Sequence, residues 1–344
     1  MKPLPASTLQ AAPPVPRGVR LPALDGLKGV AMALVLCYHA GGVLGWENTL
    51  HGEVGVDVFL LVSGVLLAVN SFHLSPGEFL KRRFLRIYPS YWAALLLYLW
   101  LNSKYYADNR SPADIGLHFL GLHAFGSPLF FSSVNDSFWF ISVIVLLYAA
   151  FFALRPRLHE LSFVVGVGGL LTLGLWVYYQ ETNNAGGLAH LACRVPTAFL
   201  GLILGQLFSG RPTQVRLTLF GAAGLAALAY ACLWRQLSLD YPLIGLAWGA
   251  VFLAVETKLR RFHPGRVLLA GLSLLGIYSY EIYLLHQPVI RDYNRLFLFQ
   301  EWGIQHPTPR QLELSMAAAF ALVVGVSVLL HQATEILFRR MRRA

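Results

Sequence analysis

The sequence predicts an all-α polytopic integral membrane protein with about ten transmembrane helices and both termini on the cytoplasmic side. Of its 344 residues, 56% are hydrophobic and only 13% are charged, whereas a soluble domain of this size would carry more charge. The apolar residues form continuous runs that suit helices crossing a hydrocarbon core of roughly 30 Å, not the short alternating segments of a β-barrel. The basic residues gather in short clusters between these runs.

Hydropathy defines ten candidate spans, of which the third and eighth are short. They cover residues 24–44, 54–72, 88–102, 137–154, 161–179, 193–209, 215–234, 241–256, 267–290 and 314–337. The longest connection, 103–136, contains HFLGLHAFGSPLFF, which is compatible with a re-entrant or interfacial segment.

The distribution of basic residues supports this count. With a cytoplasmic N-terminus and strict alternation, 19 of the 27 Lys and Arg residues fall on the cytoplasmic side and 6 on the opposite side. Cytoplasmic loops of membrane proteins carry such an excess of basic residues. The orientation of the protein in the membrane therefore explains the net charge of +10, and no nucleic-acid partner is expected.

The first twenty residues contain five prolines and no apolar core. This composition differs from that of a signal peptide and predicts a disordered cytosolic segment over residues 1–20. Residues 21–344 are then expected to form one membrane domain.

The first span places Lys28 and His39 eleven positions apart, about 16 Å along a helix. Ionisable groups inside a membrane are costly and mark functional sites, and histidine exchanges protons near neutral pH. His39 is therefore a candidate general base in a polar cavity. The alternative is a snorkelling lysine and a hydrogen-bonded core histidine.

The second span carries Asp57 near its outer end. Because the first two spans are antiparallel, Asp57 and His39 are expected at similar depth. Asp57 would then orient the imidazole and stabilise its protonated form. The alternative is a carboxylate solvated at the membrane edge.

The segment KRRFLRIYP before the third span supplies Lys81, Arg82, Arg83 and Arg86. Arg83 and Arg86 are three positions apart and share one face of a helix, and guanidinium groups suit phosphate oxygens. They are candidates for binding a polyanionic cytosolic donor, whereas Lys81 and Arg82 are typical of a positive-inside anchor.

Five further residues are candidates for an acceptor site on the outer side, although each also has a structural interpretation. They are His286, Arg194, Trp139, Tyr283 and Glu281. His286 falls near the outer end of the ninth span, so it is expected at a depth similar to that of His39. The two aromatic residues could stack on a sugar ring, but interfacial aromatic belts are common. His118 and His123, five positions apart, do not form a helical metal pair, and no metal site is expected.

Three segments, LDGLKGVAMALVLCYH, GVDVFLLVSGVLL and KRRFLRIYPSYW, together resemble membrane acyltransferase family 3, the O-acyltransferases that modify cell-envelope glycans. The family's motif of a basic residue, ten residues and a histidine matches Lys28 and His39, and its Arg-x-x-Arg motif matches Arg83 and Arg86. RVPTAFLGLILG and LGIYSYEIYLLHQPV are similar to later family motifs, so the resemblance covers most of residues 20–337.

Two positions depart from the family pattern. Ile144 stands where many members have a glutamate after the tryptophan matched by Trp139, and no proline follows Glu335 near the C-terminus. These departures leave the acceptor open more than the reaction.

The resemblance implies a bacterial inner-membrane enzyme that transfers an acyl group, with acetyl the first expectation, from cytosolic acyl-CoA. The acceptor would be a hydroxyl of an extracytoplasmic polysaccharide or of its lipid-linked precursor. His39 and Asp57 would be catalytic, and Lys28, Arg83 and Arg86 would bind the donor. Acyl-CoA is expected as a co-substrate without a tightly bound cofactor, and membrane lipids and polysaccharide-assembly proteins are expected partners. Direct transfer and an acyl-histidine intermediate both remain open.

Two other functions are compatible with the sequence. A transporter or flippase would also have many spans and intramembrane charges, although it would be favoured by inverted repeats, which are not visible. An acyltransferase acting on a small molecule or a lipid would share every feature described above.

Overall fold

The computed structural model describes residues 22–45, 52, 54–105, 110–125, 133–181, 187–208, 240–293, 298 and 302–343. Within these ranges the chain is all-α and contains no strand, in agreement with the predicted fold class. The segment 1–20 and the seventh predicted span, 215–234, lie outside the described residues.

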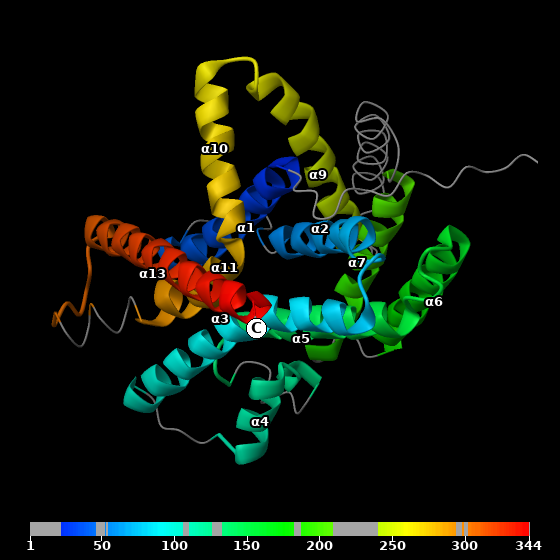
Figure 1. Cartoon of the computed structure of the whole chain (residues 1–344). Helices are drawn as coiled ribbons and strands as arrows, with labels where there is room; N and C mark the ends of the chain where they lie inside the picture. Colours follow the sequence, from blue (N-terminus) through cyan, green and yellow to red (C-terminus); the bar gives the residue numbers. More distant parts are fainter. Residues whose placement is uncertain are drawn as a thin grey trace, which may run out of the picture.

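The described elements form a bundle of helices of unequal length (Figure 1). They are α1 (Pro22–Leu44), α2 (Val54–Asn70), α3 (Pro76–Tyr105), α4 (Pro112–Leu120), η1 (His123–Phe125), η3 (Asp136–Phe138), α5 (Trp139–Leu154), α6 (Leu161–Glu181), α7 (Gly187–Phe208), α9 (Asp240–Leu259), α10 (His263–Ile277), α11 (Ser279–Pro288), the π-helical turn η4 (Val289–Tyr293) and α13 (Pro309–Arg343).

Three described helical segments are long and apolar enough to cross a membrane: Pro22–Leu44, Asp136–Leu154 and Pro309–Met341. The pair formed by α10 and the helix that follows it to Arg291 would make a fourth if it is one broken span. Val54–Asn70 and parts of α6 and α7 are shorter apolar helices. The protein is thus an all-α membrane protein by composition, while ten spans and cytoplasmic termini remain predictions.

The ninth predicted span, 267–290, is not continuous. The chain bends by 74° between α10 and α11. Tyr278 leaves the helical conformation, and the Ser279 hydroxyl donates a hydrogen bond to the carbonyl of Gly276 (2.8 Å). Hydropathy could not reveal this break, because both sides of it are apolar.

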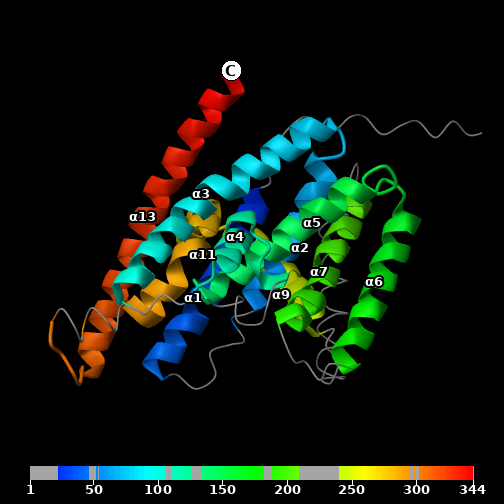
Figure 2. The same ribbon diagram turned by 90° about the horizontal axis from the view of Figure 1, so that it is seen from below.

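The third predicted span, 88–102, is only the apolar half of a 30-residue helix. The first half of α3 is the polar segment that carries Arg83 and Arg86, and Pro89 lies where the two halves meet. In Figure 2, α3 lies beside α13 near α11, and the three helices contact one another.

Glycines allow two pairs of helices to pack with their backbones in contact. A Cβ atom on Gly29 of α1 would lie 1.9 Å from the Leu272 carbonyl oxygen of α10, and one on Gly276 would lie 1.8 Å from the carbonyl oxygen of Asp25. Between α2 and α7, a Cβ on Gly64 would lie 2.1 Å from the Ala198 carbonyl oxygen. Such small residues commonly allow close contact between helices in membranes.

Gly64→Leu should therefore destabilise the protein more than a typical overpacked core variant, which loses roughly 1–3 kcal/mol, because backbone atoms stand where the side chain must go. The measurement is the midpoint of thermal unfolding of the purified protein in detergent. Gly166→Leu is the matched control, since a Cβ there meets nothing within 4 Å. Equal midpoints for both variants would contradict the close α2–α7 contact.

Candidate active site

Two histidines meet at the ends of α1 and α11. The ring centroids of His39 and His286 are 5.0 Å apart, with an angle of 58° between the ring planes. His286 is fully buried, whereas His39 is partly exposed. Their proximity agrees with the similar depth expected from the sequence, and it places a pair of proton-exchanging groups at one point of the fold.

The hydrogen bond of His286 indicates its tautomer. Its Nδ1 atom lies 2.7 Å from the carbonyl oxygen of Tyr283, and because a carbonyl only accepts, Nδ1 carries the proton. The lone pair is then on Nε2, a buried atom without a hydrogen-bond partner among the described residues. Nε2 can accept either a hydrogen bond from His39 or a proton.

Two side chains hold the end of α11 by bonding to its free carbonyls. Pro288 has no N–H to donate to the carbonyl of Leu284, and the Asn135 side chain donates to that oxygen instead (3.2 Å). The Tyr98 hydroxyl donates to the carbonyl of Leu285 (2.6 Å). Sequence reasoning missed Asn135 and Tyr98; the signal was Pro288 near the end of a helix.

A polar network connects the other side of α11 to η3. The Gln287 amide donates to Asp136 Oδ2 (3.3 Å), and Arg291 pairs with the same carboxylate oxygen (2.5 Å). Sequence reasoning also missed this pair, whose members lie 155 positions apart.

Asp57 has a different partner from the one expected. Its carboxylate pairs with Arg194 (2.5 Å) and accepts a longer hydrogen bond from Thr197 (3.4 Å). The Arg194 guanidinium in turn lies 5.2 Å from the centroid of the Trp139 ring. Asp57 thus belongs to a buried ion pair between α2 and α7, and its catalytic role beside His39 stays a prediction.

The register of the close helix contact explains this pairing. Gly64 and Gly201 meet where α2 and α7 touch, and Asp57 and Arg194 each stand seven residues, or two turns, before those glycines. The ion pair is buried on both sides. Arg194 and Trp139, expected near the acceptor, are thereby engaged within the helix bundle.

A basic pocket of about 350 Å³ lies where α3, α11 and α13 meet. It is lined by Arg82, Arg83, Arg86 and Arg339 together with Asn70, Glu281, Thr334 and Glu335. Arg83 donates to the Ser71 hydroxyl (2.6 Å), and its guanidinium carbon lies 5.3 Å from the centroid of the Phe79 ring and 5.1 Å from that of Tyr148. Arg83 and Arg86 thus face one pocket, as their spacing predicted.

Two sequence hypotheses change at this pocket. Glu281, expected on the acceptor side, lines the basic pocket instead, because the bend at Tyr278 directs the start of α11 towards α3. Lys28 pairs with Asp25 one turn earlier on α1 (2.8 Å), and it is not among the described residues that line the pocket. Its contact with a donor remains a prediction.

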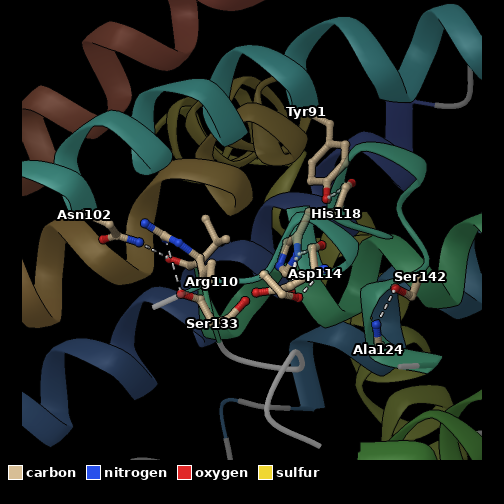
Figure 3. A network of polar contacts seen from close by, with 10 residues as sticks. Tyr91, Asn102, Arg110, Asp114, His118, Ala124, Ser133 and Ser142 are labelled. Atoms are coloured by element: carbon tan, nitrogen blue, oxygen red, sulfur yellow. Dashed lines mark hydrogen bonds and ion pairs between the residues drawn. The ribbon is translucent and has the colours of Figure 1, made fainter. Parts of the chain in front are cut away.

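The segment 110–125 is tied to the bundle by polar contacts (Figure 3). The His118 and His123 rings stack 4.0 Å apart and are fully buried. Tyr91 donates to the carbonyl of His118 (2.6 Å), and the backbone N–H of Ala124 donates to Ser142 (3.3 Å). In the part of the chain that the structure describes, no three potential metal ligands gather.

Residues 21–332 match a protein family described as an acyltransferase domain. The chain belongs to acyltransferase family 3. It is 28% identical over 337 residues to BcsY of Komagataeibacter xylinus, a candidate membrane-bound transacylase, covering 91% of this chain and 81% of that protein. It is 38% identical over 80 residues to "Protein 2 in picA locus" of Rhizobium radiobacter, covering 22% of this chain and 41% of that relative. No solved structure matches it.

Membership of this family makes the chain a membrane acyltransferase. Each of its two polar centres is then suited to one part of acyl transfer. One is a basic pocket suited to an anionic donor, and the other is a histidine pair suited to proton transfer.

Asp57→Asn should lower the stability of this acyltransferase, because it leaves the Arg194 charge buried without its counter-charge, a loss of about 3–5 kcal/mol in comparable pairs. The double variant Asp57→Leu with Arg194→Leu should recover part of that stability. Thermal unfolding in detergent measures both. A stable Asp57→Asn variant that has lost acyl transfer would instead favour the original catalytic role.

Proposed function

We propose that the protein transfers an acyl group, with acetyl the first expectation, from cytosolic acyl-CoA to a hydroxyl of an extracytoplasmic polysaccharide or its lipid-linked precursor. The observation that carries the proposal is the position of α11. Glu281 near its start lines the basic pocket, and His286 near its end lies beside His39.

The basic pocket would hold the phosphates of the donor. Coenzyme A is a polyanion, and arginines bind phosphate oxygens through paired N–H groups. From the pocket, the acyl-bearing arm would follow α11 towards the histidines, since Glu281 and His286 are five residues, or about 7.5 Å, apart along the helix.

His39 would act as the general base. A hydrogen bond from one nitrogen of His39 to Nε2 of His286 would fix its tautomer, the task first expected of Asp57, and a separation of 5.0 Å between ring centroids is compatible with that bond. The other nitrogen would take the proton of the acceptor hydroxyl. The hydroxyl oxygen would attack the thioester carbonyl, the C–S bond would break, and the leaving thiolate would take the proton from the imidazolium.

The remaining features of the proposal follow from the chemistry of the reactants. The donor is made in the cytosol and the proposed acceptor is extracytoplasmic, so the enzyme must reach both faces of a bacterial inner membrane, with polysaccharide-assembly proteins as partners. A small-molecule or lipid acceptor, an acyl-histidine intermediate, and transport without chemistry are the alternatives that the experiments below separate.

His39→Ala should reduce acyl transfer by about 10²- to 10⁴-fold, the usual contribution of a general base. Purified protein in lipid nanodiscs is incubated with labelled acetyl-CoA and candidate glycans, and labelled ester is quantified. His159→Ala is the control, since His159 is an exposed residue in the turn between α5 and α6. Full transfer by His39→Ala would overturn the assignment. If the label appears on small molecules or lipids and not on glycans, the acceptor belongs to that class. Label retained on the protein would favour an acyl-histidine intermediate. Transport of a substrate without ester formation would favour the flippase.

The double variant Arg83→Ala with Arg86→Ala should raise the KM for acyl-CoA about tenfold or more, because hydrogen bonds to charged groups are among the stronger ones. The control is Arg266→Ala, an exposed arginine at the start of α10. If the affinity for coenzyme A is unchanged while the protein remains folded, these arginines orient the protein in the membrane and do not bind the donor.

A further inference from the structure

The basic pocket contains hydrogen-bond acceptors that no described group satisfies. Glu281 is only 1% exposed. Its Oε1 atom accepts a hydrogen bond from the Ser90 hydroxyl (3.1 Å) and faces Nδ1 of His331 (3.2 Å). Its Oε2 atom is buried and has no partner among the described residues, and the same is true of Oδ1 of Asn70 in the same pocket.

Four of the side chains around these acceptors can only donate hydrogen bonds. Arg82, Arg83, Arg86 and Arg339 line the pocket, and arginine offers N–H groups without an acceptor. The Arg83 Nε atom is itself buried without a partner in the described part of the chain. A simple polyanion would satisfy the arginines, but it would leave Oε2 of Glu281 unpaired and would be repelled by its charge, and an unpaired buried carboxylate is costly.

The ligand of this pocket must therefore bring both kinds of group. It needs anionic oxygens for the arginines and at least one N–H or O–H donor for Glu281. Acyl-CoA has this combination, because an arm with two amide N–H groups and a hydroxyl separates its phosphates from its thioester.

The order of the residues along the pocket determines which part of the donor passes Glu281. The Arg82 side chain is 40% exposed and marks the open side. Glu281 is buried, and His286 lies one and a half turns further along the same helix. A donor whose phosphates lie on the arginines and whose thioester lies at the histidines must lay its amide-bearing arm against Glu281.

We propose that Glu281 is a specificity-determining residue of the donor pocket and accepts a hydrogen bond from the amide or hydroxyl groups of the acyl-CoA arm. The inference rests on the proposed function, because it assumes that the pocket takes acyl-CoA. Ser90, which donates a hydrogen bond to Oε1, and His331, whose Nδ1 atom faces Oε1, are positioning residues that leave Oε2 for the ligand.

His331 also gives α13 a part in the site. The helix supplies His331, Thr334, Glu335 and Arg339 to the same wall of the pocket region, and the His331 ring packs edge-on against Tyr278 at the bend (5.1 Å between centroids). The long C-terminal helix thus completes the donor pocket, although the family motifs that matched this chain lie mainly in earlier segments.

The test compares two ligands on the full-length protein in lipid nanodiscs. Coenzyme A carries the arm, and adenosine 3′,5′-bisphosphate carries phosphates without it. Calorimetry gives the dissociation constant of each for the wild type and for Glu281→Gln, whose amide N–H₂ would face the pocket as a donor. Coenzyme A should bind at least tenfold more weakly to the variant. The bisphosphate should bind equally well or more tightly, because a negative charge has been removed from among the arginines.

Three further variants distinguish the orientation of the Glu281 carboxylate from a general effect of removing a negative charge. His331→Phe removes the imidazole nitrogen that faces Oε1 (3.2 Å) and should weaken the binding of coenzyme A severalfold without weakening that of the bisphosphate. His331→Gln places a polar amide at the same position and should restore most of the affinity. Glu313→Gln makes the same chemical change at an exposed position of α13 and should alter neither ligand. Thermal unfolding of each variant shows whether the fold is retained.

Each outcome discriminates between the hypotheses. Failure of the wild type to bind coenzyme A at all would overturn the proposed donor. If coenzyme A binds but Glu281→Gln leaves its affinity unchanged, or shifts both ligands in the same direction, the assigned contact with the arm is wrong. Should the variants fail to fold, the wild type still offers a test, because coenzyme A that binds no more tightly than the bisphosphate would show that the arm is not held.

Discussion

The bend between α10 and α11 is the constraint on which the rest of the site depends. It is possible because α1 and α10 touch through Gly29 and Gly276 without intervening side chains, so that α10 ends against the start of α1. The chain then turns by 74°, and one ten-residue helix connects the basic pocket to the histidine pair. A straight helix through residues 267–290 would carry Glu281 and His286 in a different direction.

At the end of α11, side chains from other elements replace the backbone hydrogen bonds that Pro288 interrupts. Pro288 cannot continue the backbone hydrogen bonds of the helix, and unsatisfied carbonyls inside a membrane protein are costly. Asn135 and Tyr98 supply the missing donors from two other elements. The proline therefore links α11 to the segment before η3 and to α3, and His286 is held at the point where these elements meet.

The carboxylates illustrate why partners are harder to predict than candidates. Asp57, Glu281 and Asp136 all lie in or beside apolar segments, and two of them were singled out from the sequence. Asp57 was expected beside His39 because both lie near the same end of antiparallel helices. Depth alone does not fix the direction of a side chain around a helix axis, and the contact of α2 with α7 directs Asp57 to Arg194 instead.

The all-α membrane class, the family, the face shared by Arg83 and Arg86, and the similar depth of His39 and His286 could all be predicted from the sequence. These properties follow from composition, from helical periodicity and from short motifs, which are all local along the chain. The packed helices were needed to reveal the bend at Tyr278, the Asp57–Arg194 pair, the place of Glu281 in the basic pocket and the contribution of His331. These depend on the rotation of helices about their axes and on contacts between distant segments, for which a single sequence carries no local signal.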